Sequence, residues 1–106
     1  MTAATVRYVV AVRLTRAPPI DRLPDPATVV DLFWAHAVPA DRLDHVRTSA
    51  PAPAGRLDIA VILRAESAED CLRTVRNLCA RTTRSPTLSG WTAERLSTLP
   101  LAGLGF

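Results

Sequence analysis

The chain has 106 residues, 48% hydrophobic and 22% charged, which is the composition of one globular domain and excludes a disordered segment. Its formal net charge is +3, and all thirteen basic residues are arginine. These arginines are spread along the chain rather than gathered in a basic run, so the sequence argues against a selected nucleic-acid-binding surface.

The two cysteines, Cys71 and Cys79, fall on one expected helix. A separation of eight residues at a rise of about 1.5 Å places them about 12 Å apart, too far to bridge each other. The sequence has no Cys-x-x-Cys pair, Cys/His cluster or cofactor motif. The apolar run Tyr8–Val12 is too short for a signal peptide or a membrane span. We therefore expect a cytoplasmic protein with no metal, no cofactor and no membrane partner.

The first expected strand is Thr5–Leu14. The apolar residues of one face are Val6, Tyr8, Val10, Val12 and Leu14, and the other face has Arg7, Val9, Ala11 and Arg13. A proline-containing loop, Thr15–Leu23, follows the strand. Asp25 and Pro26 then predict the start of a helix that continues to about Ala37 and ends before Pro39. Its expected inner face consists of Val29, Val30, Phe33 and Ala37.

The next expected strand, Leu43–Thr48, alternates poorly. Leu43, His45 and Arg47 would share one side, and Asp44, Val46 and Thr48 the other. Charges on both sides favour an edge strand. The segment Ser49–Gly55 contains two prolines and is expected to be a loop.

Arg56–Arg81 joins a strand directly to a helix. Leu57, Ile59, Val61 and Leu63 alternate with Asp58, Ala60, Ile62 and Arg64. Ser67 is the predicted helix N-cap. The apolar stripe of the helix consists of Ala68, Cys71, Leu72, Val75, Leu78 and Cys79.

The last expected strand is Thr87–Leu96, after Pro86. It closes a single domain over residues 1–98, followed by an uncharged apolar tail over 99–106. The order strand, helix, strand, strand, helix, strand predicts a ferredoxin-like α+β sandwich, with a four-stranded antiparallel sheet and two helices on one face. The first and third strands would be central, and they are also the most apolar.

In that fold the second face of the sheet stays open. Val9, Ala11, Ala60 and Ile62 would form an apolar patch there, bordered by Arg7, Arg13, Asp58 and Arg64. Such a patch indicates a docking surface. We therefore expect a small non-enzymatic binding, assembly or regulatory module that forms a homodimer through this face, with a larger protein as a further partner. The tail residues Leu101, Leu104 and Phe106 would join this interface or pack on their own subunit.

Two alternatives stay open. A cofactor-free enzyme or small-ligand binder of the dimeric α/β-barrel type would use Trp34, His36, His45 and Trp91 as an aromatic-lined pocket. The sequence has no catalytic motif, so we assign no catalytic residue. Nonspecific nucleic-acid binding is the second alternative, with backbone contacts by Arg7, Arg13 and Arg64. Base stacking is not expected, because Tyr8 has the parity of the helix-covered face.

Overall fold

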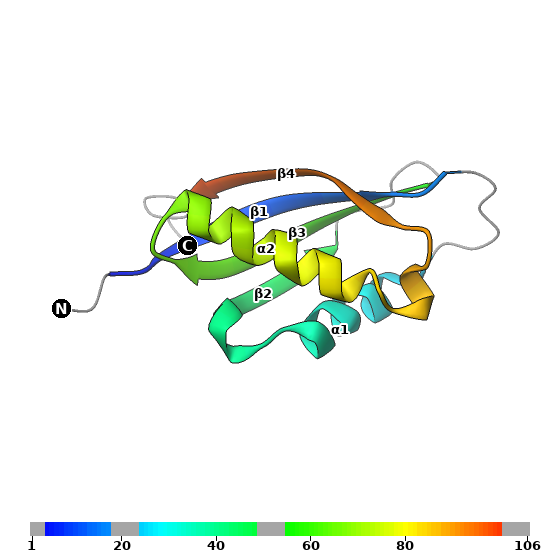
Figure 1. Ribbon diagram of the computed structural model, residues 1–106, viewed down its shortest axis with the longest axis horizontal. Coiled ribbons are helices and arrows are strands. Elements are labelled where there is room, and N and C mark those ends of the chain that lie inside the picture. The colour runs from blue at the N-terminus through cyan, green and yellow to red at the C-terminus, as the bar shows by residue number, and fades with distance from the viewer. Residues whose placement is uncertain (1–3, 18–23, 49–54, 101–106) are drawn as a thin grey trace.

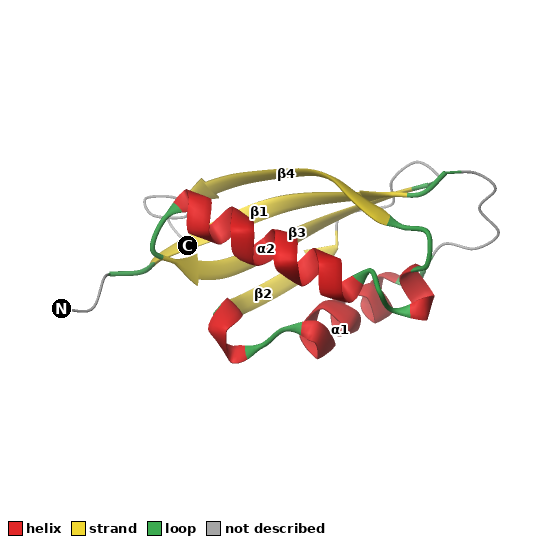
Figure 2. Ribbon diagram, viewed as in Figure 1, coloured by secondary structure: helices red, strands yellow, loops and turns green. Residues whose placement is uncertain are grey.

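The computed structural model describes residues 4–17, 24–48 and 55–100. Four strands and two helices alternate in the order strand, helix, strand, strand, helix, strand, with one short 3-10 turn before the second strand and another before the fourth (Figures 1 and 2). The elements are β1 (Val6–Thr15), α1 (Pro26–His36), η1 (Pro39–Asp41), β2 (Leu43–Thr48), β3 (Arg56–Ala65), α2 (Ala68–Thr82), η2 (Pro86–Leu88) and β4 (Thr92–Pro100).

The four strands form one antiparallel sheet in the order β2-β3-β1-β4, and both helices cover the same face of it (Figure 1). This is the ferredoxin-like two-layer α+β sandwich, so the predicted fold is confirmed. β1 and β3 are the central strands, paired continuously from Val6–Ala65 to Thr15–Arg56.

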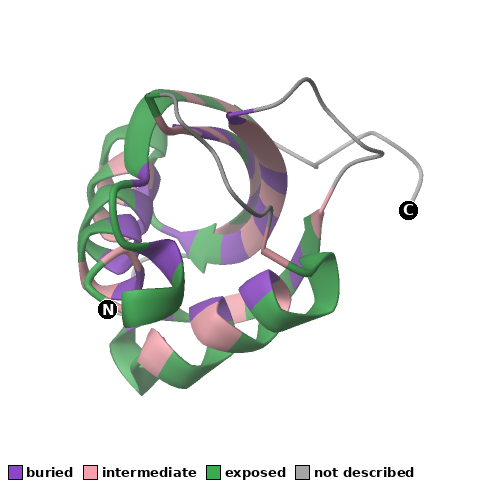
Figure 3. Ribbon diagram, turned by 90° about the vertical axis from the view of Figure 1, so that its right-hand side faces the viewer, coloured by how far each residue is buried: buried purple, intermediate pink, exposed green. Residues whose placement is uncertain are grey.

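The core lies between the sheet and the helices, where buried residues alternate with exposed ones along the strands (Figure 3). Tyr8, Val10, Val12 and Leu14 of β1 are all buried, as their parity predicts. The partners that β3 contributes to this layer are Ile59, Val61, Leu63 and Ala65.

α2 begins as its sequence predicts, because the Ser67 side chain accepts a hydrogen bond of 3.1 Å from the Asp70 backbone N–H. Cys71, Val75, Leu78 and Cys79 are buried along its apolar stripe. Burial raises the pKa of the Cys79 thiol from its ordinary 9.0 to about 11. Both cysteines are free thiols of the core.

α1 packs only part of its wide apolar surface against the core. Val29 and Phe33 are fully buried, whereas Trp34 is 44% exposed. Its predicted start is confirmed by Pro26 in the first turn, but the Asp25 carboxylate caps no backbone N–H and instead accepts a bond of 3.4 Å from the Thr28 hydroxyl.

Arg81 joins the C-terminal end of α2 to η1 through an ion pair and to the end of α1 through a hydrogen bond. Arg81 Nη2 of α2 lies 2.6 Å from the Asp41 carboxylate in η1, and Arg81 Nε donates to the backbone carbonyl of His36, at the end of α1. Asp41 is only 7% exposed and also accepts a bond from the Val38 N–H. Arg81 thus fixes how the end of α1 sits against α2.

The last strand differs from the prediction of Thr87–Leu96, since β4 begins at Thr92 and ends at Pro100. Thr87 and Leu88 lie in η2, and Gly90 then takes a positive φ of 85° that turns the chain into the strand. Leu99, assigned to the tail from the sequence, is therefore part of the sheet. The tail residues Leu101, Leu104 and Phe106 lie outside the described residues.

Both edge strands contain a register shift next to the central strands. In β2 the shift lies between Leu43 and His45, so that Asp44 is the extra residue. In β4 the extra residue is Glu94, which interrupts the pairing with β1 at Arg13 and Leu14. The shift in β2 corrects the sequence interpretation, because Leu43 and His45 are on opposite faces of the sheet rather than on the same one.

Within the described residues, neither helix is long and apolar enough to cross a membrane.

Candidate functional site

On the open face of the sheet, where neither of the described helices lies, the residues form rows that run across the strands. Residues that are direct partners on neighbouring strands lie side by side, so the pairing of the four strands defines these rows. In the order β2, β3, β1, β4, the apolar row is His45, Ile62, Val9 and Leu99, and the small-residue row is Arg47, Ala60, Ala11 and Ser97. The charged row, contributed by β3, β1 and β4, is Asp58, Arg13 and Arg95.

The apolar row and the two alanines beside it form one continuous apolar strip. Val9 and Ile62 are half-buried by their neighbours, and Leu99 is 65% exposed. The register brings Val9, Ala11, Ala60 and Ile62 together, as the sequence predicts. Leu99 was not assigned to this strip from the sequence because it follows the expected end of the last strand.

Followed along the central strands, the strip is bordered by ion pairs on both sides. At one end Asp58 accepts from Arg56 Nη2 at 2.7 Å and from Arg13 Nε at 3.2 Å. The bond from Arg56 and the further bond from Arg13 hold the pKa of Asp58 below its ordinary value, although partial burial opposes them. At the other end Asp44 lies 3.1 Å from Arg7 and 3.5 Å from Arg64.

The bulge in β2 explains how Asp44 reaches this face. In a regular strand Asp44 and His45 would point to opposite sides, which is the arrangement expected from the sequence. The extra residue instead lets the Asp44 carboxylate reach Arg7 and Arg64, while His45 pairs with Ile62 on the same face.

The open face is also the basic surface of the molecule. Register and ion pairs place six arginines and two aspartates there, and Glu94 of β4 lies close enough to Arg56 for their charges to attract each other, so basic groups outnumber acidic ones on this face. The six are Arg7, Arg13, Arg47, Arg56, Arg64 and Arg95. Arg47 and Arg95 form no ion pair with any residue between 4 and 100 that the structure describes.

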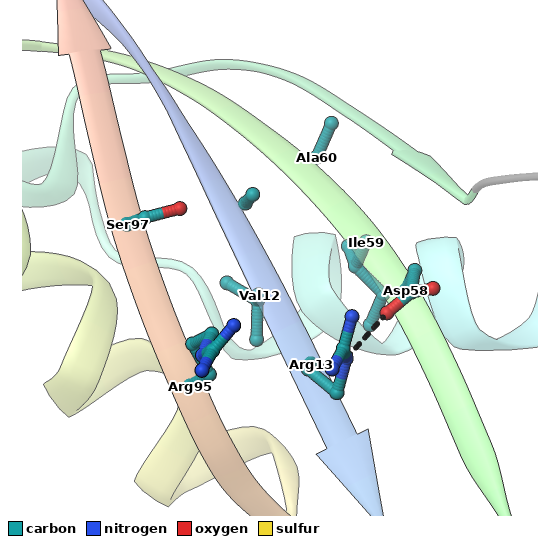
Figure 4. Close-up of a pocket in the computed structure, with 8 residues that line it drawn as sticks. Val12, Arg13, Asp58, Ile59, Ala60, Arg95 and Ser97 are labelled. Carbon is teal, nitrogen blue, oxygen red and sulfur yellow. Dashed lines mark hydrogen bonds and ion pairs between the residues drawn. The ribbon is translucent and has the colours of Figure 1, made fainter.

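A hollow of about 360 Å³ lies in this face between β3, β1 and β4 (Figure 4). Its floor is low because Ala11 and Ala60 stand directly opposite each other and have the shortest side chains of the rows. Arg13, Asp58, Arg95 and Ser97 line its sides. The hollow therefore results from two small residues surrounded by longer polar ones.

The four residues predicted to line an aromatic pocket do not come together. Trp34 lines a separate hollow of about 290 Å³ with Val38 and Leu43, at the end of α1. His45 lies on the open face, on the other side of the sheet. Trp91 is only 3% exposed and belongs to the core, where its indole N–H has no hydrogen-bond partner among the described residues.

His36, the fourth, is half-buried at the end of α1 and does not line the Trp34 hollow. In the part of the chain that the structure describes, no three His, Cys, Asp or Glu side chains are grouped in a way that could hold a metal ion.

No protein-family model matches the chain, and no curated protein matches it. Among solved structures, a similar chain is the uncharacterized protein TM1266 from Thermotoga maritima, with 15% sequence identity and a TM-score of 0.43. The similarity covers 92% of this chain and 99% of that one. A likeness of this size bears on neither fold nor function.

Proposed function

We propose that the protein is a small non-enzymatic binding module that associates through the open face of its sheet, with a second copy of itself as the first partner. The observation that supports this proposal is the apolar strip, in which Val9, Ile62 and Leu99 lie side by side on the face opposite the two described helices. A continuous apolar patch with a charged border is typical of a protein interface.

The strip and its border suit a twofold contact. In a twofold homodimer the same patch from each copy meets its equivalent, so a strip that is apolar in the middle can bury itself against its own copy. Each square ångström of apolar surface removed from water contributes about 25 cal/mol. Because Asp44 and Asp58 already pair with arginines at the two ends, these ends need no partner charge from the second copy.

The positive charge of the open face should weaken this dimer at low salt. Two surfaces of the same sign repel each other when they meet, and dissolved salt screens that repulsion over about 10 Å at 0.1 M. We therefore expect the homodimer to become more stable as salt concentration rises.

The test is sedimentation equilibrium over a range of protein and salt concentrations. We expect a monomer–dimer equilibrium that shifts toward dimer with added salt. Ile62→Arg places a charge in the middle of the apolar strip and is expected to abolish the dimer. Ala80→Arg adds the same charge at an exposed position of α2 and serves as the matched control. A monomer under all conditions, or equal weakening by both variants, contradicts the homodimer.

Nonspecific nucleic-acid binding is a second candidate, favoured by the six arginines of the open face. Its salt dependence has the opposite sign, because binding to phosphates releases counterions and weakens steeply as salt rises. Retention on immobilised DNA that disappears with salt would support it. The aromatic-pocket enzyme gains no support, because Trp34, His45 and Trp91 lie in three separate places.

A further inference from the structure

We propose that the hollow over Ala11 and Ala60 binds a small organic anion, with its phosphate or carboxylate group held at Arg95 and Ser97 and its apolar body lying over the two alanines. The floor of this hollow belongs to the apolar strip, so a dimer formed through the strip would cover it. The anion is therefore proposed to bind a single copy, and its binding does not depend on docking.

The first argument is an unbalanced charge. Arg13 and Arg95 are direct partners across β1 and β4 on the open face, and like charges in that arrangement repel each other. Asp58 compensates Arg13 at 3.2 Å but is shared with Arg56 at 2.7 Å. No described acidic side chain pairs with Arg95. An anion placed beside Arg95 would remove the repulsion between the two arginines.

The second argument is the supply of unused hydrogen-bond donors. Arg13 donates to Asp58 through Nε, and its terminal nitrogens make no hydrogen bond with the described residues. The Ser97 hydroxyl also lines the hollow, is exposed, and has no described side-chain partner. Arginine and serine donors within one hollow match the acceptor oxygens of a carboxylate or phosphate.

The arrangement of the hollow also orients its ligand. Figure 4 shows Arg95 and Ser97 on the β4 side, and Asp58 and Ala60 on the β3 side. The Asp58 carboxylate repels an anion, and the arginines that hold its pKa low keep it ionised at neutral pH. The anionic group is therefore directed to the β4 side, and the apolar body to the floor between Ala11 and Ala60.

The size of the hollow sets the size of the ligand. A volume of about 360 Å³ is at the lower end of the range for small-molecule sites, which is about 300–1,000 Å³. A single ring with one anionic substituent is a suitable probe. Phenyl phosphate and benzoate carry the two anionic groups, and benzyl alcohol has a similar body without charge.

The experiment is isothermal titration calorimetry of the full chain with these three probes. We expect saturable binding of phenyl phosphate, of benzoate, or of both, and none of benzyl alcohol. The tighter of the two anions identifies the class of group that the site takes. Arg95→Gln is expected to weaken binding by about tenfold or more, since it removes a charge-assisted hydrogen bond.

Two further variants separate a built site from general attraction to a basic protein. Arg76→Gln removes the same charge from an exposed position of α2 with no described ion pair, and it should leave binding unchanged. Ala60→Leu keeps every charge but fills the floor, and it should abolish binding. The proposal is overturned if neither anion saturates the wild-type protein, if Arg76→Gln weakens binding as much as Arg95→Gln, or if Ala60→Leu binds like the wild type.

The titration is repeated on Ile62→Arg, in which docking through the apolar strip is blocked and the hollow is unchanged in its lining residues. Binding that persists there is binding by a single copy. A protein that never dimerises but binds the anion refutes the docking proposal alone. A protein that dimerises, and whose monomeric Ile62→Arg variant binds no anion, refutes this one alone.

Discussion

The two faces of the sheet are built by the same strands and differ in almost everything else. Along β1, Val10, Val12 and Leu14 are at most 2% exposed beneath the helices, whereas Ala11 and Arg13 between them face outward. Burial of one face fixes the strand register, because a slip of one residue would bring Ala11 and Arg13 into the core. The other face is free of that packing requirement, so it can hold charges, small residues and a hollow.

The largest expected effect is on the covered face. Phe33→Ala removes a side chain that is 0% exposed and should lower the free energy of unfolding by about 3–5 kcal/mol, through lost burial and the cavity left behind. Urea denaturation measures the difference. Trp34→Ala is the matched control, because it removes the neighbouring aromatic ring from the same helix. The Trp34 residue is already 44% exposed in the folded protein, so its loss should cost less. Equal losses in the two variants would contradict the assignment of the inner face of α1.

A second effect concerns the thiol of Cys79. An unfolded cysteine ionises near its ordinary pKa of 9.0, whereas the folded protein keeps the proton until about pH 11. Unfolding therefore releases a proton between these values, and stability falls as pH rises from about 9 to about 11, by about 2–3 kcal/mol. Denaturation at several alkaline pH values measures the slope, which Cys79→Ala should reduce. An unchanged slope in this variant would show that the thiol does not contribute.

The smallest effect is expected on the open face. Leu99→Ser changes a side chain that is 65% exposed, so the free energy of unfolding measured on the monomer should change by no more than about 0.5 kcal/mol. The same variant should weaken the proposed dimer. A loss of stability close to that of Phe33→Ala would mean that Leu99 is covered within its own subunit. The open face would then not be exposed at Leu99.

Strong periodic patterns made most of the fold predictable from the sequence. The alternation in β1 and β3 and the 3.6-residue stripe of α2 each extend over ten or more residues, and tertiary packing agrees with them. Where the pattern is weak, the prediction was wrong. The segment that contains Leu88 and Trp91 begins with Pro86, so it forms a turn instead of a strand, and these two side chains enter the core from it.

The candidate site was predictable in part. Parity alone places Val9, Ala11, Ala60 and Ile62 on the open face. The hollow, the contribution of Leu99 and the position of Asp44 depend on how β4 and β2 are aligned with the central strands. That alignment includes an extra residue in each edge strand, and alternation in a single strand carries no information about it.

These two extra residues also limit how copies of the molecule can associate. An uninterrupted edge strand offers free backbone donors and acceptors to the next molecule, and sheets joined edge to edge can grow without end. Here each edge departs from regular pairing, and each has acidic and basic side chains, among them Asp44 and Arg47 in β2 and Glu94 and Arg95 in β4. Growth of a continuous sheet into filaments is disfavoured at both borders. The proposed association would use the broad face instead, where two copies would form a closed pair and assembly would stop.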